Sequence, residues 1–205
     1  MTEPTPKGHI THNIGIIPML LIGIALLFVV SCNKPSTPRP DGYFRIESYP
    51  DSYTAHTIGC IKLHINDSAR CQYPTHTAND GVVWLNLIYP RYNATIYLSY
   101  IPIDNNLDRL IAESTELVYR QNINTEMVEA VAYENPESSV YATLYALSSE
   151  SATPIQFIAT DSVQYLLRGA LYYDKPVKAD SVAPSLQYLE NDIMQLIESI
   201  TPINK

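Results

Sequence analysis

The chain has 205 residues, a formal net charge of −8 at neutral pH, and 16 tyrosines against three phenylalanines and one tryptophan. An acidic chain without a basic cluster is not suited to bind nucleic acid, whose phosphates attract basic side chains. Because tyrosine packs its ring while its hydroxyl stays hydrated, this composition favours broad β-sheets with one partly solvated face.

The start of the chain has the pattern of an export signal. An uninterrupted apolar run extends from Ile14 to Val30 and is followed by Ser31 and Cys32. Aliphatic residues, a small residue and a cysteine in this order resemble the site cut by the lipoprotein signal peptidase. We therefore predict a signal peptide over residues 1–31 and a lipid-anchored Cys32; the alternative is an uncleaved single-span anchor.

A proline-rich segment follows this cysteine. Residues 32–41 contain Pro35, Pro38 and Pro40 among polar side chains, a composition that stays extended and does not fold alone. We interpret it as a tether between the lipid and one folded α+β domain over residues 42–205. That domain is long enough to bury a sizeable core.

The folded domain opens with strand signals. Residues 43–46 form a short one, and residues 82–89 form a longer apolar run. Side chains alternate over residues 94–101, so that one face of this strand is expected to carry Ala94, Ile96, Leu98 and Tyr100. The short spacer between the two longer runs predicts an antiparallel hairpin.

A helix is predicted next, with Asn105 or Asn106 as its N-terminal cap. Its buried face is expected to carry the residues that recur at helical spacing: Leu107, Leu110, Ile111, Ser114, Leu117 and Val118. Since the opposite face is charged, the helix should lie on a sheet. Residues 123–131 fit either a short strand or a helical turn.

Three further strands are predicted over residues 139–147, 153–160 and 165–173. The turn residues Thr160-Asp161-Ser162 indicate a hairpin between the last two.

The chain closes with a predicted helix, capped by Asp180 or Ser181 and with Pro184 in its first turn. Its expected buried stripe consists of Val182, Leu186, Leu189, Ile193, Leu196, Ile197 and Ile200. The order of elements predicts an α+β fold, in which two main helices pack on an antiparallel β-sheet.

A series of segments from residue 42 to residue 199 carries a family resemblance. In chain order they are Gly42-Tyr43-Phe44-Arg45-Ile46, Trp84-Leu85-Asn86-Leu87-Ile88-Tyr89-Pro90, Ala94-Thr95-Ile96-Tyr97-Leu98-Ser99-Tyr100, Gln156-Phe157 with Thr160-Asp161-Ser162, Leu167-Arg168-Gly169-Ala170-Leu171-Tyr172-Tyr173, Asp180-Ser181 with Pro184, Asp192-Ile193 and Ile197-Glu198-Ser199. Behind a lipoprotein signal, this series resembles the gliding motility lipoprotein GldD family of Bacteroidetes. The chain departs from the family at Ser148-Ser149-Glu150-Ser151, where a Gly-Asn turn is expected, and over residues 48–80.

The resemblance implies a role in gliding motility and in the type IX secretion machinery, with other envelope proteins of that apparatus as partners. It implies no catalytic activity and no cofactor. Surface-exposed lipoproteins of this bacterial group often carry acidic residues just after the lipidated cysteine, whereas Asn33, Lys34 and Pro35 follow it here. We therefore expect attachment to the outer membrane on its periplasmic side.

The sequence contains no Gly-x-Ser-x-Gly elbow, no glycine-rich phosphate loop and no His-Glu-x-x-His zinc helix. The leading hypothesis is therefore a non-enzymatic accessory lipoprotein that needs no cofactor. The alternative is a module that binds a small ligand, such as a glycan or a lipid, in a tyrosine-lined cleft beside the sheet.

Cysteines and histidines gather in one irregular region, in the order Cys60, His64, Cys71 and His76. Since export compartments favour oxidation, a Cys60–Cys71 disulfide is the first interpretation. Two alternatives stay open: free buried thiols, and a tetrahedral zinc site made by the four residues.

Arg168 stands inside an otherwise apolar strand, where a charge must be paired or exposed. Asp161, across the predicted hairpin, is its expected partner, and Gln156 is a second one. We favour an ion pair that fixes the register of the hairpin over the functional interpretation, which is a site that binds an anion or a partner.

Asp67-Ser68-Ala69 resembles the Asp-Ser/Thr-aliphatic acceptor for O-glycosylation of exported proteins in this bacterial group. Ser68 lies in polar loop sequence and is the expected acceptor. Ser162 and Ser181 stand in similar triplets, but a turn and a helix cap explain them better.

Overall fold

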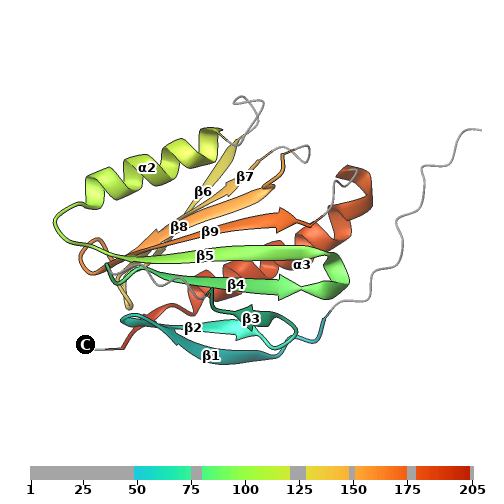
Figure 1. Cartoon of the computed structure of the whole chain (residues 1–205), viewed down its shortest axis with the longest axis horizontal. Helices are drawn as coiled ribbons and strands as arrows, with labels where there is room; N and C mark the ends of the chain where they lie inside the picture. Colours follow the sequence, from blue (N-terminus) through green and yellow to red (C-terminus); the bar gives the residue numbers. More distant parts are fainter. Residues whose placement is uncertain (1–48, 75–79, 121–127, 148–150, 175–178, 204–205) are drawn as a thin grey trace, which may run out of the picture. The chain divides into compact units, whose positions relative to one another are not determined.

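The computed structural model describes residues 49–74, 80–120, 128–147, 151–174 and 179–203, which Figure 1 draws as ribbon. The chain divides into two compact units, Met1–Gly42 and Tyr43–Lys205, and every described residue belongs to the second. The predicted signal peptide, Cys32, the tether and the predicted strand at residues 43–46 lie outside the described residues.

The described residues form antiparallel β-sheets and two main helices, which confirms the predicted α+β class. The strands are β1 (Tyr53–Ile58), β2 (Ile61–Asn66), β3 (Arg70–Gln72), β4 (Val83–Tyr89), β5 (Ala94–Pro102), β6 (Glu129–Asn135), β7 (Val140–Ala146), β8 (Ile155–Thr160), β9 (Tyr165–Tyr173) and β10 (Thr201–Pro202). The helices are α2 (Leu107–Arg120), α3 (Ala179–Glu198) and the short 3-10 helix η1 (Pro90–Tyr92).

The strands form two sheets, not the single sheet that was predicted. The larger one has the order β3-β4-β5-β9-β8-β7-β6, and the smaller one has the order β1-β2-β10. The segment over residues 48–80 departs from the family and includes the irregular region with the cysteines and histidines, yet its described residues form three strands. The signal was present in β2, where Ile61, Leu63 and Ile65 are buried while Lys62 and His64 are exposed.

The hairpin of β4 and β5 has the predicted pairing. Its turn contains η1 and ends at Asn93, which has φ 48°, a left-handed conformation that asparagine tolerates better than most residues. The predicted inner face of β5 is buried at all four positions: Ala94, Ile96, Leu98 and Tyr100. The strand alternation was therefore enough to place these side chains in the core.

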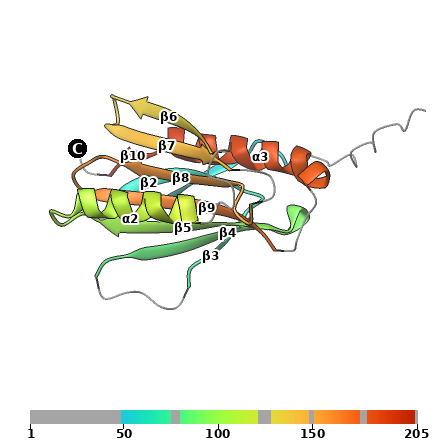
Figure 2. The ribbon, with the colours of Figure 1, turned by 90° about the horizontal axis from the view of Figure 1, so that it is seen from above.

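The two main helices lie on opposite faces of the seven-stranded sheet, as Figure 2 shows from above. On one face, the predicted stripe of α3 joins the small sheet in the main core through Leu189, Ile193, Leu196 and Ile197. On the other face, Leu110 and Val118 of α2 form a second, smaller core with residues of β7, β8 and β9: Tyr145, Ile158 and Leu166.

The buried stripe of α2 is narrower than predicted. Leu110, Ser114 and Val118 are buried, whereas Ile111 and Leu117 are 38% and 36% exposed. The helix contacts the sheet along one row of residues spaced by four, so the neighbouring positions turn to the rim. The core under α2 reaches β5 only at Ile101, and among the described residues Tyr97, further along the same face of β5, stays 45% exposed.

A half-buried carboxylate, that of Asp192, joins α3 to the strands β1 and β2. The Tyr53 hydroxyl donates to Asp192 Oδ1 at 2.8 Å, and the Asn66 side-chain amide donates to the same oxygen at 3.2 Å. Burial raises the pKa of Asp192, although the hydrogen bonds from Tyr53, Asn66 and Tyr89 act in the opposite direction. Burial and the neighbouring carboxylate raise the pKa of Tyr53 to about 12.

Candidate functional site

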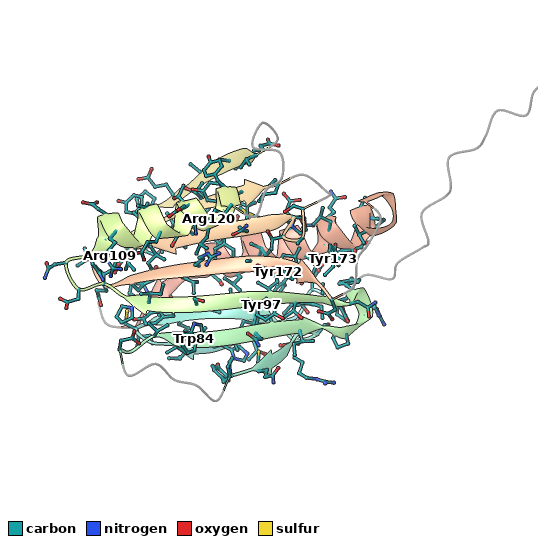
Figure 3. All side chains as sticks on the ribbon, turned by 45° about the horizontal axis from the view of Figure 1, so that its top comes forward. Trp84, Tyr97, Arg109, Arg120, Tyr172 and Tyr173 are labelled. Atoms are coloured by element: carbon teal, nitrogen blue, oxygen red, sulfur yellow. The ribbon has the colours of Figure 1, made fainter. Side chains whose placement is uncertain are left out.

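The open face of the seven-stranded sheet carries aromatic side chains on three neighbouring strands. Figure 3 shows Trp84 on β4, Tyr97 on β5 and Tyr172 on β9, on the face where α2 also lies. Tyr97 is 45% exposed, and its ring meets that of Tyr172 edge to face, with centroids 5.4 Å apart. Such pairs are favourable for aromatic rings, so the two tyrosines support each other's orientation.

A groove lies beside these tyrosines. We call it the Arg168 groove; it has a volume of about 420 Å³ and is lined by Tyr97, Ser99, Leu117, Arg168, Ala170 and Tyr172.

The pairing of β5 with β9 explains why a hollow forms there. Tyr97 lies opposite Ala170, and Ser99 lies opposite Arg168, so that a small residue faces each large one. Since alternate residues of a strand share a face, Ala170 also separates Arg168 from Tyr172. The two small side chains, Ser99 and Ala170, leave the space between the larger ones unfilled.

The guanidinium of Arg168 is the chemically distinctive group of this groove. Its Nη2 donates to Gln156 Oε1 over a long 3.4 Å, and its Nε is buried without a hydrogen-bond partner. Gln156 is itself fully buried, and its Nε2 donates to Thr153 Oγ1 at 3.0 Å. Burial lowers the pKa of Arg168, and the neighbouring Tyr172 acts in the opposite direction.

The predicted ion pair between Arg168 and Asp161 is wrong. Asp161 lies in the turn between β8 and β9, where its Oδ1 accepts the backbone N–H groups of Val163, Gln164 and Tyr165 at 3.0, 2.7 and 3.2 Å. The register places Arg168 opposite Ile158, well inside the strand. The local amides therefore hold the carboxylate, and of the two predicted partners it is Gln156 that contacts Arg168.

The predicted Cys60–Cys71 disulfide is absent from the structure, in which both thiols are free. Cys60 lies in the turn between β1 and β2, and its Sγ accepts the Tyr100 hydroxyl at 3.3 Å. Cys71 lies in β3 opposite Leu87, where burial raises the pKa of its thiol. Cys60 therefore lies in a turn of the smaller sheet and Cys71 lies in a strand of the larger one, and each thiol has different neighbours.

The proposed zinc ligands do not come together in the part of the chain that the structure describes. No group of three histidine, cysteine, aspartate or glutamate side chains suited to a metal occurs there. His64 is exposed on β2, whose alternation turns it away from the buried side of that strand. His76 lies outside the described residues.

Ser68 lies in the turn between β2 and β3 and is half-buried. Its backbone N–H donates to Asn66 Oδ1 at 2.9 Å, while the neighbouring Asp67 accepts the Ser52 hydroxyl. The side chain of Asn66 thus organises this turn and also reaches Asp192. O-glycosylation of Ser68 stays a prediction.

Sequence reasoning missed most of the groove. The alternation over residues 94–101 puts Tyr97 and Ser99 on the face opposite Ala94, Ile96, Leu98 and Tyr100, but nothing local indicates that β9 lies beside them. Arg168 was singled out because a charge in an apolar strand is unusual, and that signal was sound.

The sequence matches a known protein family. The sequence model of the family described as "Gliding motility lipoprotein GldD" matches residues 33–201. The chain belongs to the GldD lipoprotein family. No protein of curated function matches it.

Membership of this family associates the chain with gliding motility and with membrane anchoring in the cell envelope. No helix in the described residues is long and apolar enough to cross a membrane. The apolar run of residues 14–30 and Cys32 lie outside those residues, and the family match begins directly after Cys32.

Proposed function

We propose that this GldD family member is a non-enzymatic accessory lipoprotein of the gliding motility and type IX secretion apparatus. Lipid on Cys32 would hold it at the outer membrane, on the periplasmic side. The family match over residues 33–201 supports the link to gliding. The lipobox-like residues before Cys32 support the anchor, and the lack of acidic residues just after it supports the periplasmic face.

The observation that carries the accessory role is the open aromatic face of the large sheet. Tyr97 and Tyr172 line the groove together with Arg168, Trp84 lies on the neighbouring strand β4, and α2 meets the groove at its rim through Leu117. Tyrosine, tryptophan and arginine are the residues that most often dominate protein interfaces. A protein that works by contacting others needs such a surface, whereas the sequence offers no catalytic motif.

The test of this function is deletion of the gene in its host. We expect loss of type IX cargo from the medium and loss of surface motility where the host glides. Reintroduced wild-type protein should restore both, and Cys32→Ala, which cannot be lipidated, should not. Normal secretion and normal motility in the deletion strain would refute the proposal.

A second candidate is a module that binds a small ligand, a glycan or a lipid. The convergence of Tyr97 and Tyr172 with Arg168 in a groove of about 420 Å³ favours it, since tyrosine rings stack on sugars and arginine holds anions. Titration of the full-length protein in detergent with envelope glycan fragments and phospholipids distinguishes the two. Binding that Arg168→Gln abolishes, combined with normal secretion in a strain carrying that variant, would favour the ligand module.

A further inference from the structure

Among the described residues, Arg168 has no anionic partner. In the part of the chain that the structure describes, ion pairs join Arg109 to Glu113 and Arg120 to Glu116, and none involves Arg168. Of the described residues that line the groove, Arg168 alone carries a charge. The nearby partner Gln156 is neutral and its oxygen accepts over 3.4 Å.

Leaving a half-buried guanidinium in this state is unfavourable. Its Nε is shielded from water and unpaired, and burial disfavours the charged form, which an arginine nevertheless keeps. A carboxylate in the groove would accept from the guanidinium at the short distances of charge-assisted hydrogen bonds. The hydroxyl of Ser99, directly across from Arg168, can donate to the same carboxylate.

The shape of the groove indicates the source of that carboxylate. Sites for small molecules are clefts that bury most of the ligand, whereas this groove lies open along a sheet face. Around it lie large side chains that are well exposed, among them Tyr97 at 45% and Leu117 at 36%. A protein segment can cover this surface while it inserts one acidic side chain, and a small acid cannot.

We propose that the Arg168 groove is a docking site for a segment of a partner protein, which places an aspartate or glutamate carboxylate against Arg168. The segment lies across Tyr97 and Tyr172 and packs against Leu117 at the rim of α2. This inference rests on the proposed function, because it assumes that the lipoprotein works through a protein partner.

The first test is photo-cross-linking of the full-length lipoprotein in its own envelope. Tyr97→p-benzoylphenylalanine places the probe at the groove. The matched control is Tyr141→p-benzoylphenylalanine, on the same sheet face and 44% exposed against 45% for Tyr97. We expect an adduct from Tyr97 alone, with a protein segment that contains Asp or Glu. A glycan or lipid adduct, a segment without a carboxylate, or no adduct would overturn the proposal.

The second test changes the charge of the groove. Arg168→Gln should lower the adduct yield from Tyr97 about tenfold, the effect of losing a charge-assisted hydrogen bond. Arg120→Gln, at an exposed position of α2, should leave the yield unchanged. Arg168→Glu combined with Arg at the acidic residue of the cross-linked segment should restore it. An unchanged yield in Arg168→Gln, or no restoration in the pair, contradicts the proposal.

A third variant covers the case in which Arg168→Gln does not fold. Ser99→Glu places a carboxylate on β5 directly opposite Arg168, so it should pair with the guanidinium inside the protein. We expect Ser99→Glu to unfold at a higher urea concentration than Ser99→Gln. Because its own carboxylate occupies Arg168, Ser99→Glu should also lower the adduct yield from the probe at position 97 more than Ser99→Gln does. Equal adduct yields in the two Ser99 variants would show that charge plays no part.

These tests separate the two proposals. Deletion of the gene reports whether secretion and motility need the lipoprotein, whatever it contacts. Cross-linking reports what occupies the groove, whether or not secretion changes. If deletion impairs secretion or motility but no acidic segment is cross-linked at Tyr97, the docking site is contradicted and the accessory role is not.

Discussion

Replacing the half-buried carboxylate of Asp192 tests how the helix α3 is joined to the strands. In Asp192→Ala, the Tyr53 hydroxyl and the Asn66 amide lose the oxygen to which they donate at 2.8 and 3.2 Å. Each lost hydrogen bond costs about 1 kcal/mol, so the two together predict a loss of about 2 kcal/mol in the free energy of unfolding; the Asn66 amide keeps its other bond, to the Pro50 carbonyl at 3.3 Å. For a domain of this size the midpoint of thermal unfolding should fall by roughly 4 to 8 °C.

The assay is urea unfolding of the full-length protein in detergent, followed by the fluorescence of Trp84, the single tryptophan of the chain. Asp192→Asn is the matched control, because its side-chain oxygen still accepts from both donors. We expect it to lie within about 1 kcal/mol of the wild type at neutral pH. If Asp192→Ala loses less than about 0.5 kcal/mol, the network does not join α3 to the strands as described.

We also predict that the stabilities of the wild type and Asp192→Asn differ in their pH dependence. Burial raises the folded-state pKa of Asp192 above its ordinary value of 3.8, and the nearby Asp51 adds a like charge in the same direction. Between these two pKa values the folded state binds more protons than the unfolded state, so wild-type stability falls as the pH rises through that window. Asp192→Asn lacks this contribution. The difference between their free energies of unfolding should therefore be most favourable to the wild type below pH 3.8 and should decrease above it.

Three further predictions concern the sheets and the thiols. Gly169→Ala should lose about 1 to 3 kcal/mol in urea unfolding, because the added Cβ would lie 2.0 Å from the ring of Phe157, and Phe157→Leu should recover part of it. Asp161→Ala should lose about 1 to 2 kcal/mol, since three turn amides lose their acceptor, and an unchanged midpoint would contradict this. In protein that was unfolded without any exposure to reductant, a thiol reagent should modify both Cys60 and Cys71. If neither cysteine reacts, the two form a disulfide after all.

Local patterns in the sequence were sufficient for most elements. Alternation along residues 94–101 placed one face of β5 in the core, because successive side chains of a strand point to opposite sides whatever lies beside it. The stripe of α3 was found for a similar reason, since its periodicity depends only on the helix itself. The turn at Asp161 was also local, because its carboxylate reaches amides within four residues.

The partners of each strand were decided only by the tertiary structure. Alternation does not say which strand lies beside which, so the pairing of β5 with β9 was not predictable from either strand. That pairing sets Ser99 opposite Arg168 and Tyr97 opposite Ala170, and it thereby creates the groove. The predicted ion pair failed for the same reason: two residues close in sequence were assumed to meet, but the turn amides held Asp161.

The sequence alone was therefore enough to single out Arg168 as an unusual charge, whereas only the fold decided which groups surround it. A cation within an apolar strand indicated by itself that a partner is needed, because burying an unpaired charge is costly in any fold. Which groups surround it depends on the packing of β5, β9 and α2, elements that the sequence predicted separately. The predicted lipid anchor is the opposite case, since the expected signal is a local pattern of an apolar run, a small residue and a cysteine, which depends on no tertiary structure.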